Sequence, residues 1–350
     1  MKNAERISSA KEHLVWIDIL RILAIFSVIV QHSATYYFEG GYGNSLAIHA
    51  LNNLSRFHVP SFVMITGVLL LGRDMPPKKI WTKYIKRIAI AFCFWSFLYT
   101  TYNFAYRWGQ VEIIELIKGA IGDFCYGGTR VLWYIVMLFG LYAITPMLST
   151  WVKNAGRQEQ IYAVGILLAL SSVLPTLTMV HPLNLLLDTN LERLQMVIPG
   201  VLVFFYLAGF IFVKNENLLS KRATQVLAII VVAVSAAIIC GYSIVTQETL
   251  DLNCLPIVGL SLGVFVLVRY RGNHYCDTFK IVIRNAADCT FGIFLVHRLI
   301  QYLLQLSGAE SVLLSLYPVV GVMLYSVVVF FASWILVALL RLNRFGRIIT

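Results

Sequence analysis

The chain has 350 residues, of which 59% are hydrophobic and only 13% carry a charge. That charged fraction is about half of what soluble globular proteins use, and with a mean hydropathy of +0.77 it excludes a water-soluble globule. In lipid, only helices or a closed barrel satisfy their own backbone hydrogen bonds. The long continuous apolar runs exclude a barrel, whose strands would alternate in polarity. We therefore predict an all-α, polytopic membrane protein that forms a single domain over residues 1–350.

Ten apolar runs are long enough to cross a hydrocarbon core of about 30 Å. They cover residues 14–37, 49–71, 80–103, 131–152, 160–180, 194–213, 223–245, 252–269, 286–306 and 312–340. The first run follows basic residues, as a signal peptide would, but no small-residue cleavage site comes after it, so we expect a retained helix. Segment 111–121 has a polar face at helical spacing and is too short to span, which predicts a helix lying flat at one interface.

The net charge of +11 is distributed unevenly along the predicted loops. With the amino terminus in the cytoplasm, 21 Lys and Arg residues fall on the cytoplasmic side and 5 on the outer side, leaving Arg21 and Arg298 within spans. Under the positive-inside rule this asymmetry predicts that both termini are cytoplasmic. The positive charge is thus a topology signal, and we do not expect nucleic acid as a partner.

The first span carries three ionisable residues, Asp18, Arg21 and His32. Charged groups inside a bilayer cost roughly 2.5–3.5 kcal/mol each, so those that persist usually face a cavity. At 100° per residue all three lie on one helical face, with Arg21 and His32 about 16 Å apart along the axis. A purely structural alternative remains open, in which Asp18 and Arg21 pair at the inner interface and His32 makes a helix contact.

Further polar residues fall in the second and ninth spans. His58 is expected at a depth similar to that of His32, where a structural role and a functional role are both open. His297 and Arg298 are adjacent, so their side chains point about 100° apart and at most one of them fully faces a shared cavity. Arg298 could instead extend toward the outer interface.

Two other groups mark the ends of spans. The basic residues Lys83, Lys86 and Arg87 precede the third span, where they either set topology or form a funnel for the phosphates of an anionic cofactor. Trp133 and Tyr134 open the fourth span at the outer interface, where aromatic belts are expected without any function.

Several chemistries lack their usual signals. The chain has no Walker A loop and no GxGxxG motif after a strand, and its six cysteines show no CxxC or Cys/His ligand spacing. Histidines 32, 58 and 297 lack a neighbouring carboxylate that would complete a metal site, so no metal is expected.

Taken together, these residues resemble the acyltransferase-3 family of integral membrane O-acyltransferases. The resemblance covers residues 14 to about 306 and rests on five motifs in the right order. The first runs from Trp16-Ile17-Asp18 through Arg21 to His32 and is similar to an Arg-x10-His signature; the second is the Pro-Ser-Gly segment from Val59 to Leu70; the third, Lys83 to Arg87, is similar to a basic RxxR-type motif. The fourth is Leu132-Trp133-Tyr134 followed by Tyr142 and Pro146, and the fifth, Thr290 to His297, is similar to a Ser-x-x-Ile-Tyr-x-x-His stretch. The chain departs from the family pattern at four positions, Ile22, Thr66, Lys83 and Lys86. The two lysines lack the bidentate phosphate geometry of arginine.

The resemblance implies a multi-pass O-acyltransferase of the bacterial inner membrane. Acetyl-CoA or another acyl-CoA would donate the acyl group from the cytoplasm, and a hydroxyl of a saccharide or glycolipid would accept it at the outer side. The implied catalytic residues are His32 as general base, a task that suits an imidazole, and Arg21, oriented by Asp18. The implied cofactor-binding residues are Lys83, Lys86 and Arg87, and the implied substrate-binding residues are His58, Trp133, Tyr134, His297 and Arg298.

Physics alone suits a second class equally well, a transporter or flippase for a lipid-linked saccharide. Such proteins usually show internal repeats with paired broken helices, and the sequence shows none. A membrane-embedded scaffold without chemistry would not require Arg21 and His32 on one helical face. The acceptor, the acyl group and the choice between an acyl-enzyme and direct transfer stay open at this stage.

Overall fold

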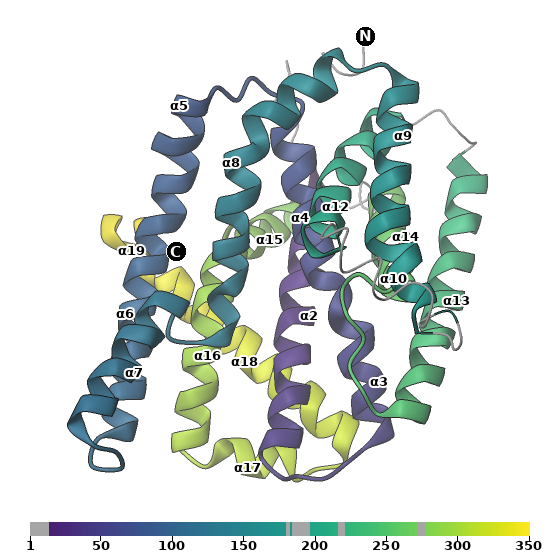
Figure 1. The fold of residues 1–350 in the computed structure, drawn as a ribbon. Coiled ribbons are helices and arrows are strands. Elements are labelled where there is room, and N and C mark those ends of the chain that lie inside the picture. The colour runs from purple at the N-terminus through teal and green to yellow at the C-terminus, as the bar shows by residue number, and fades with distance from the viewer. Residues whose placement is uncertain (1–13, 180–182, 184–196, 216–220, 272–276) are drawn as a thin grey trace. The chain divides into compact units, whose positions relative to one another are not determined.

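The computed structural model describes residues 14–179, 183, 197–215, 221–271 and 277–350. Within these ranges the regular elements are helices and none is a strand, which confirms the predicted all-α class (Figure 1). Among the described residues, six helices are long and apolar enough to cross a membrane, or seven if the bent pair Lys280–Asp288 and Thr290–Leu306 forms one span. The protein is therefore a multi-pass membrane protein, while ten spans with cytoplasmic termini stay a prediction.

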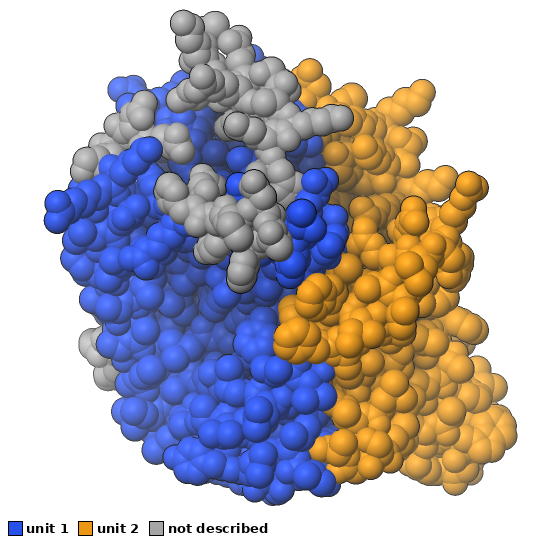
Figure 2. All heavy atoms as spheres, turned by 180° about the vertical axis from the view of Figure 1, so that it is seen from behind, with its two compact units in different colours: residues 1–73, 151–288, 310–328 blue, residues 74–150, 289–309, 329–350 orange. Residues whose placement is uncertain are grey.

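The chain divides into two compact units, coloured separately in Figure 2. Unit 1 comprises residues 1–73, 151–288 and 310–328, and unit 2 comprises residues 74–150, 289–309 and 329–350. The helices of unit 1 are α2 (Val15–Glu39), α3 (Leu46–Leu54), η1 (Ser55–Phe57), α4 (His58–Leu70), α9 (Arg157–Leu168), η4 (Ala169–Val173), α10 (Leu174–Leu177), α12 (Val197–Lys214), α13 (Lys221–Thr246), α14 (Leu255–Arg271), α15 (Asp277–Asp288) and α17 (Ala309–Leu314). Those of unit 2 are α5 (Pro77–Lys79), η2 (Ile80–Ile85), α6 (Lys86–Arg107), α7 (Ile113–Tyr126), η3 (Arg130–Leu132), α16 (Thr290–Leu306) and α19 (Arg344–Ile349). Two helices continue from one unit into the other, α8 (Trp133–Asn154) and α18 (Pro318–Leu340).

In unit 1, two glycines allow α4 and α12 to pack with their backbones in contact. A Cβ atom on Gly67 would overlap the carbonyl oxygen of Tyr206, and one on Gly209 would overlap that of Met64. Small residues at such a crossing are typical of membrane helices, which associate through close packing rather than through the hydrophobic effect. Helix α4 also packs against α2, so this glycine contact fixes the position of a helix that borders the first span.

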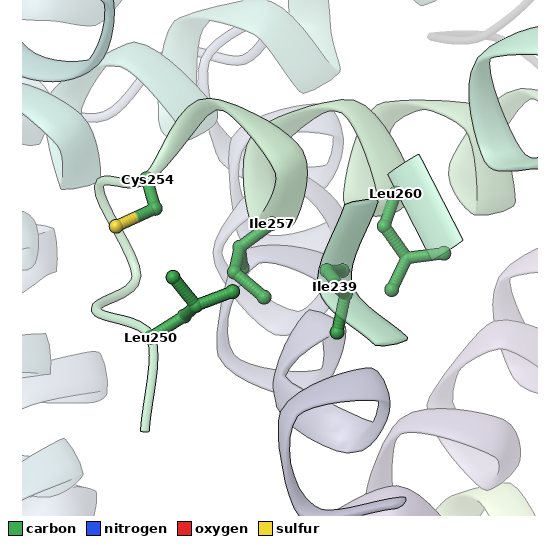
Figure 3. Close-up of a cluster of buried hydrophobic side chains, with 5 residues drawn as sticks. All are labelled: Ile239, Leu250, Cys254, Ile257 and Leu260. Carbon is green, nitrogen blue, oxygen red and sulfur yellow. The ribbon is translucent and has the colours of Figure 1, made fainter. Parts of the chain in front are cut away.

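A hydrophobic cluster joins α13 to α14 in the same unit (Figure 3). Its buried members are Ile239, Leu250, Cys254, Ile257 and Leu260. The fully buried amide of Asn53 in α3 connects this helix to the cluster. Its Nδ2 donates to Ser243 Oγ at 2.9 Å, and its Oδ1 accepts from the backbone N–H of Leu250 at 2.9 Å. Both functions of this amide are satisfied inside the fold, which marks it as structural.

In unit 2, α7 folds back along α6. Arg107 at the end of α6 lies 3.4 Å from the carboxylate of Asp123 in α7, and Asn103 donates to the same carboxylate at 3.0 Å. The helix predicted for segment 111–121 therefore exists, but it extends to Tyr126, where Gly127 ends it in a left-handed conformation with a φ of 98°. Its orientation to the bilayer stays a prediction.

Helix α6 also holds α16 and α19. The indole of Trp95 donates to the carbonyl oxygen of Ile349 at 2.9 Å, and the hydroxyl of Tyr99 donates to that of Leu295 at 2.6 Å. Both aromatic side chains are buried, so these hydrogen bonds satisfy their polar atoms while the rings fill the core of unit 2.

Three of the predicted apolar runs are interrupted in the structure. Run 49–71 is divided at η1, because Pro60 has no N–H to bond the carbonyl of the residue four positions earlier. Run 312–340 is divided between α17 and α18, where Pro318 restricts the residue before it. Run 286–306 is divided at Cys289, where no local sequence signal marks the break. These interruptions lower the number of unbroken apolar helices below the number of apolar runs.

Candidate active site

The predicted site residues divide between the two units. Unit 1 contains Asp18, Arg21, His32 and His58, and unit 2 contains Lys83, Lys86, Arg87, Trp133, Tyr134, His297 and Arg298. Each group is therefore described within its own unit.

Helix α2 holds Arg21 against a buried carboxylate. Arg21 Nη1 lies 3.3 Å from Asp18 Oδ1, and the two side chains are 28% and 5% exposed. Residues three apart lie on one side of a helix, so this contact follows directly from the spacing. The pair fits both interpretations left open by the sequence, a structural ion pair and a carboxylate that orients the guanidinium of Arg21.

His32 lies farther along the same helix and is half-buried. Helix α2 runs without interruption from Val15 to Glu39, so the axial separation of about 16 Å between Arg21 and His32 and their common face hold in the folded chain. Between them, Ser27 Oγ donates to the carbonyl oxygen of Ser55 at 2.7 Å and ties α2 to η1.

His58 is the first residue of α4 and is buried at 7% exposure. Its helix packs against α2, so His58 and His32 lie on neighbouring helices of unit 1. The arrangement fits both alternatives left open for His58, a structural role and a role in binding substrate.

In unit 2, aromatic contacts connect the start of α8 to the middle of α16. The ring centroid of buried Tyr134 lies 5.4 Å from that of Phe294, which lies 6.1 Å from the imidazole of His297. Trp133 is 45% exposed, as expected of an aromatic residue in an interfacial belt, and its ring centroid lies 6.4 Å from that of Tyr134 in an edge contact. Phe294 thus connects Tyr134 to His297, and the more exposed Trp133 touches this group only through Tyr134.

The protonation of His297 follows from its partners. The imidazole is fully buried, and its Nδ1 lies 2.7 Å from the carbonyl oxygen of Phe294 and 3.2 Å from that of Ile293. Carbonyl oxygens only accept hydrogen bonds, so Nδ1 carries the proton and donates. In the neutral ring, Nε2 therefore carries the lone pair and is the basic atom.

Arg298, by contrast, is half-buried and folds over its own helix. Its guanidinium lies 5.1 Å from the ring centroid of Tyr302, and Nη1 donates to Gln301 Oε1 at 3.3 Å. The Tyr302 ring in turn stacks on Tyr102 of α6 at 4.4 Å. His297 is fully buried and Arg298 is not, which is consistent with side chains that point about 100° apart; whether either one faces a shared cavity stays a prediction.

Gln301 and Tyr302 were missed by sequence reasoning. Their signal was available, because residues three and four positions after Arg298 share its helical face. The late motif ends at His297, so the resemblance assigns no role to the next helical turn.

The basic residues near the start of α6 are exposed. Lys83 lies in the π-helical segment η2, with Nζ 5.8 Å from the ring centroid of Tyr84. The guanidinium of Arg87 lies 5.8 Å from the ring of Phe291, in the first turn of α16. Lys86 begins α6. Arg87 is therefore placed by a contact with the late motif, which the sequence did not predict.

The described part of the chain contains no group of three His, Cys, Asp or Glu side chains that could hold a metal ion.

Comparison with protein families gives one match. The acyltransferase-3 family model, described as an acyltransferase domain, matches residues 14–338. The chain belongs to this family. It is accordingly a multi-pass membrane acyltransferase. Neither the curated proteins nor the solved structures give a match.

Membership of the acyltransferase-3 family confirms the resemblance drawn from the five motifs. All five motifs now have a local structural context: α2 carries the first, α4 the second, η2 and α6 the third, and α16 the last. The Trp-Tyr motif spans η3 and the start of α8.

Proposed function

We propose that this acyltransferase moves an acetyl group from acyl-CoA on the cytoplasmic side of the bacterial inner membrane to a hydroxyl of a saccharide or glycolipid at the outer side. The acceptor oxygen forms an ester bond with the acyl carbon, the thioester C–S bond breaks, and CoA leaves as the thiol with the hydroxyl proton. No metal takes part in this scheme.

The observation that carries the proposal is the continuity of α2. An acyltransferase that joins a donor on one side of a membrane to an acceptor on the other needs groups at different depths of one span. Helix α2 provides Arg21, held by Asp18 at 3.3 Å, and His32 on the same face about 16 Å away along the axis.

In the proposal, His32 is the general base that removes the proton of the acceptor hydroxyl. An imidazole side chain suits this task, and that of His32 is half-buried. Arg21 contacts the acyl donor, and Asp18 keeps its guanidinium in place.

The phosphates of acyl-CoA are assigned to Lys83, Lys86 and Arg87. These three side chains are exposed and cationic, and the Arg87 guanidinium is held in place beside the Phe291 ring. A planar guanidinium fixed in this way can bind a phosphate through two hydrogen bonds, whereas the two lysines act as point charges.

The acceptor is assigned to His58, Trp133, Tyr134, His297 and Arg298. Aromatic rings and neutral hydrogen-bonding groups suit a polyhydroxylated ligand, which presents apolar faces and many hydroxyls. Tyr134, Phe294 and His297 already form one connected aromatic group in unit 2.

The test uses the purified chain in detergent, incubated with acetyl-CoA labelled in the acetyl group and with a bacterial membrane saccharide fraction. We expect free CoA to appear together with label in an alkali-labile ester on the saccharide. Release of neither CoA nor label would overturn the proposal. Label that is transferred to an amine, and therefore resists mild alkali, would contradict the O-acetyl assignment.

A further inference from the structure

Unit 2 contains a buried side chain whose hydrogen-bonding capacity is only half used. Gln301 lies in the middle of α16 and is fully buried. Its Oε1 accepts a hydrogen bond from Arg298 Nη1 at 3.3 Å. Its Nε2 has no hydrogen-bond partner among the described residues.

The contact with Arg298 fixes the orientation of the Gln301 amide. The two ends of a glutamine amide are nearly indistinguishable by shape and are assigned from their partners. A guanidinium can only donate, so the oxygen must face Arg298 and the NH₂ group must point elsewhere. The unused group is therefore a pair of N–H donors, which is what an oxygen ligand requires.

A second buried glutamine differs from Gln301 in the use of its donors, although its Oε1 likewise has no hydrogen-bond partner among the described residues. Gln160, 1% exposed, uses its Nε2 to donate to the carbonyl oxygens of Val152 at 2.8 Å and Ala155 at 3.1 Å. Its donors thus satisfy carbonyls at the end of α8 that the helix cannot pair. The donors of Gln301 do nothing comparable, although a buried donor without an acceptor is destabilising.

The location of Gln301 connects it to the proposed chemistry. It lies one helical turn after His297, so the two side chains share a face of α16. The imidazole Nδ1 donates to the carbonyl oxygen of Phe294 at 2.7 Å, which leaves the basic lone pair on Nε2. A neutral donor and a basic nitrogen on one face suit an uncharged oxygen, because a hydroxyl both donates and accepts.

We propose that Gln301 binds a substrate through a hydrogen bond from its Nε2 to an uncharged oxygen of that substrate. The inference rests on the proposed function, in which two such oxygens occur, the acceptor hydroxyl and the carbonyl of the acyl thioester. The contact with Arg298 orients the amide for this purpose. An amide donor of this kind can fix a hydroxyl in place or stabilise negative charge on a carbonyl oxygen during acyl transfer.

Two substitutions separate this role from a merely structural one. Gln301→Glu keeps an oxygen against Arg298, where a carboxylate binds a guanidinium more strongly than an amide does, but it removes the N–H donors. Gln301→Met has a similar length and removes both functions. If Gln301 only holds Arg298, the Glu variant retains activity and the Met variant loses it. If Nε2 binds substrate, both variants lose activity to a similar extent.

The experiment measures steady-state acetyl transfer from acetyl-CoA to a bacterial membrane saccharide fraction by both variants and the wild type, with thermal unfolding of each purified protein as the folding control. Binding of the acceptor hydroxyl predicts roughly a tenfold rise in the apparent KM for the saccharide, with an unchanged KM for acetyl-CoA. Binding of the thioester carbonyl predicts a fall in kcat of about a hundredfold with both KM values unchanged.

Wild-type kinetic constants in Gln301→Glu would overturn the inference while leaving the proposed function intact. A wild-type protein that transfers no acetyl group would overturn both. If Gln301→Glu does not fold, Gln301→Asn provides the same test, because it withdraws the amide by one methylene. Unchanged kinetic constants in that variant would equally overturn the inference.

Discussion

Helices α2 and α16 each carry an arginine and a histidine, but they hold them in different ways. In α2 the arginine is paired with a carboxylate, Asp18, at 3.3 Å, and the histidine lies three turns farther along the same face. In α16 the two residues are adjacent, and Arg298 is held by a neutral amide and a tyrosine ring. Helix α2 is unbroken, whereas α16 begins directly after an interruption at Cys289.

In the proposed reaction, this difference predicts separate tasks for the two helices. A guanidinium beside a carboxylate is firmly oriented, but part of its charge is compensated, which suits a residue that must keep its place. The two contacts of Arg298 described above, with an amide and an aromatic ring, each hold a guanidinium less firmly than a carboxylate does. We therefore expect the residues of α2 to control the rate of the chemical step and those of α16 to control recognition.

The largest expected effect is the presence or absence of thiol labelling, which tests the direction in which α2 and α16 cross the membrane. Single cysteines that replace Asn44 or Tyr317 should react with membrane-impermeant thiol reagents in intact cells, and one that replaces Pro77 should react only after permeabilisation. Asn44 lies between α2 and α3, and Tyr317, which is 76% exposed, lies between α17 and α18. The distribution of positive charge assigns the segment of Asn44 to the outer side, and Tyr317 directly precedes α18 at the end that the same topology places outside.

The labelling requires a background without the exposed native thiols Cys93 and Cys125. Gly308 is a poor labelling position, because its φ of 75° strains any residue with a Cβ atom. Reaction of the Pro77 cysteine in intact cells would reverse the assignment of Arg21 to the inner half of the membrane and of Arg298 to the outer half. The separate tasks expected of α2 and α16 would then be wrong.

Replacing the histidine of α2 should have the next largest effect. His32→Ala removes the proposed base and should lower kcat for acetyl transfer by about 10²–10⁴. Thermal unfolding of the purified protein should stay close to that of the wild type, because the imidazole is only half-buried. His49→Ala in α3 is the matched control; this histidine contacts Asn44 and stacks on Phe38, and its loss should not change kcat.

The arrangement in α2 could be predicted from the sequence because it is local. Asp18, Arg21 and His32 lie on one helix, and the period of an α-helix fixes their face without any knowledge of tertiary structure. The all-α class followed from the same kind of evidence, since apolar runs of this length must be helical in lipid. The contact between Arg21 and Asp18 is accordingly confirmed in detail.

The arrangement around α16 could be predicted only in part. That His297 and Arg298 point apart follows from their adjacency on a helix, and their different burial agrees with it. The contact between Arg87 and Phe291 joins segments far apart in the chain, and no local pattern encodes it. The interruption at Cys289 also lacks a signal, unlike those near Pro60 and Pro318, where the chemistry of proline explains the break.

The position of Arg87 beside Phe291 predicts an effect of intermediate size on the affinity for CoA. Lys86→Gln and Arg87→Gln should each weaken binding of CoA roughly tenfold, because a charge-assisted contact is lost but solvent screens part of it. Isothermal titration of CoA into the purified variants measures the change directly. Arg87→Lys should bind more weakly than the wild type but more tightly than Arg87→Gln, since a lysine keeps the charge and loses the planar fork.

The control for these variants is Lys79→Gln in the same basic segment. Lys79 already donates to the carbonyl oxygen of Asp74 at 2.9 Å, and we assign it no part in binding CoA. Equal CoA affinity for Lys79→Gln, Lys86→Gln and the wild type would show that these charges set topology alone.

The smallest expected effect concerns the carboxylate that distinguishes α2 from α16. Asp18→Asn removes the charge opposite Arg21 and should lower the free energy of unfolding by about 1–2 kcal/mol. A hydrogen bond between charged groups contributes roughly 1.5–3 kcal/mol, and the 28% exposure of Arg21 allows solvent to screen part of it. The same variant should raise the KM for acetyl-CoA, because Arg21 would no longer be held in one orientation.

A second ion pair of nearly the same length provides the control for this prediction. Arg107 and Asp123 in unit 2 lie 3.4 Å apart, but their side chains are 45% and 25% exposed, against 28% and 5% for the pair in α2. Asp123→Asn should therefore change the free energy of unfolding by less than about 1 kcal/mol and should leave the KM for acetyl-CoA unchanged. Equal losses of stability and equal KM values in the two variants would mean that burial of the carboxylate does not distinguish them, and that α2 has no special hold on its arginine.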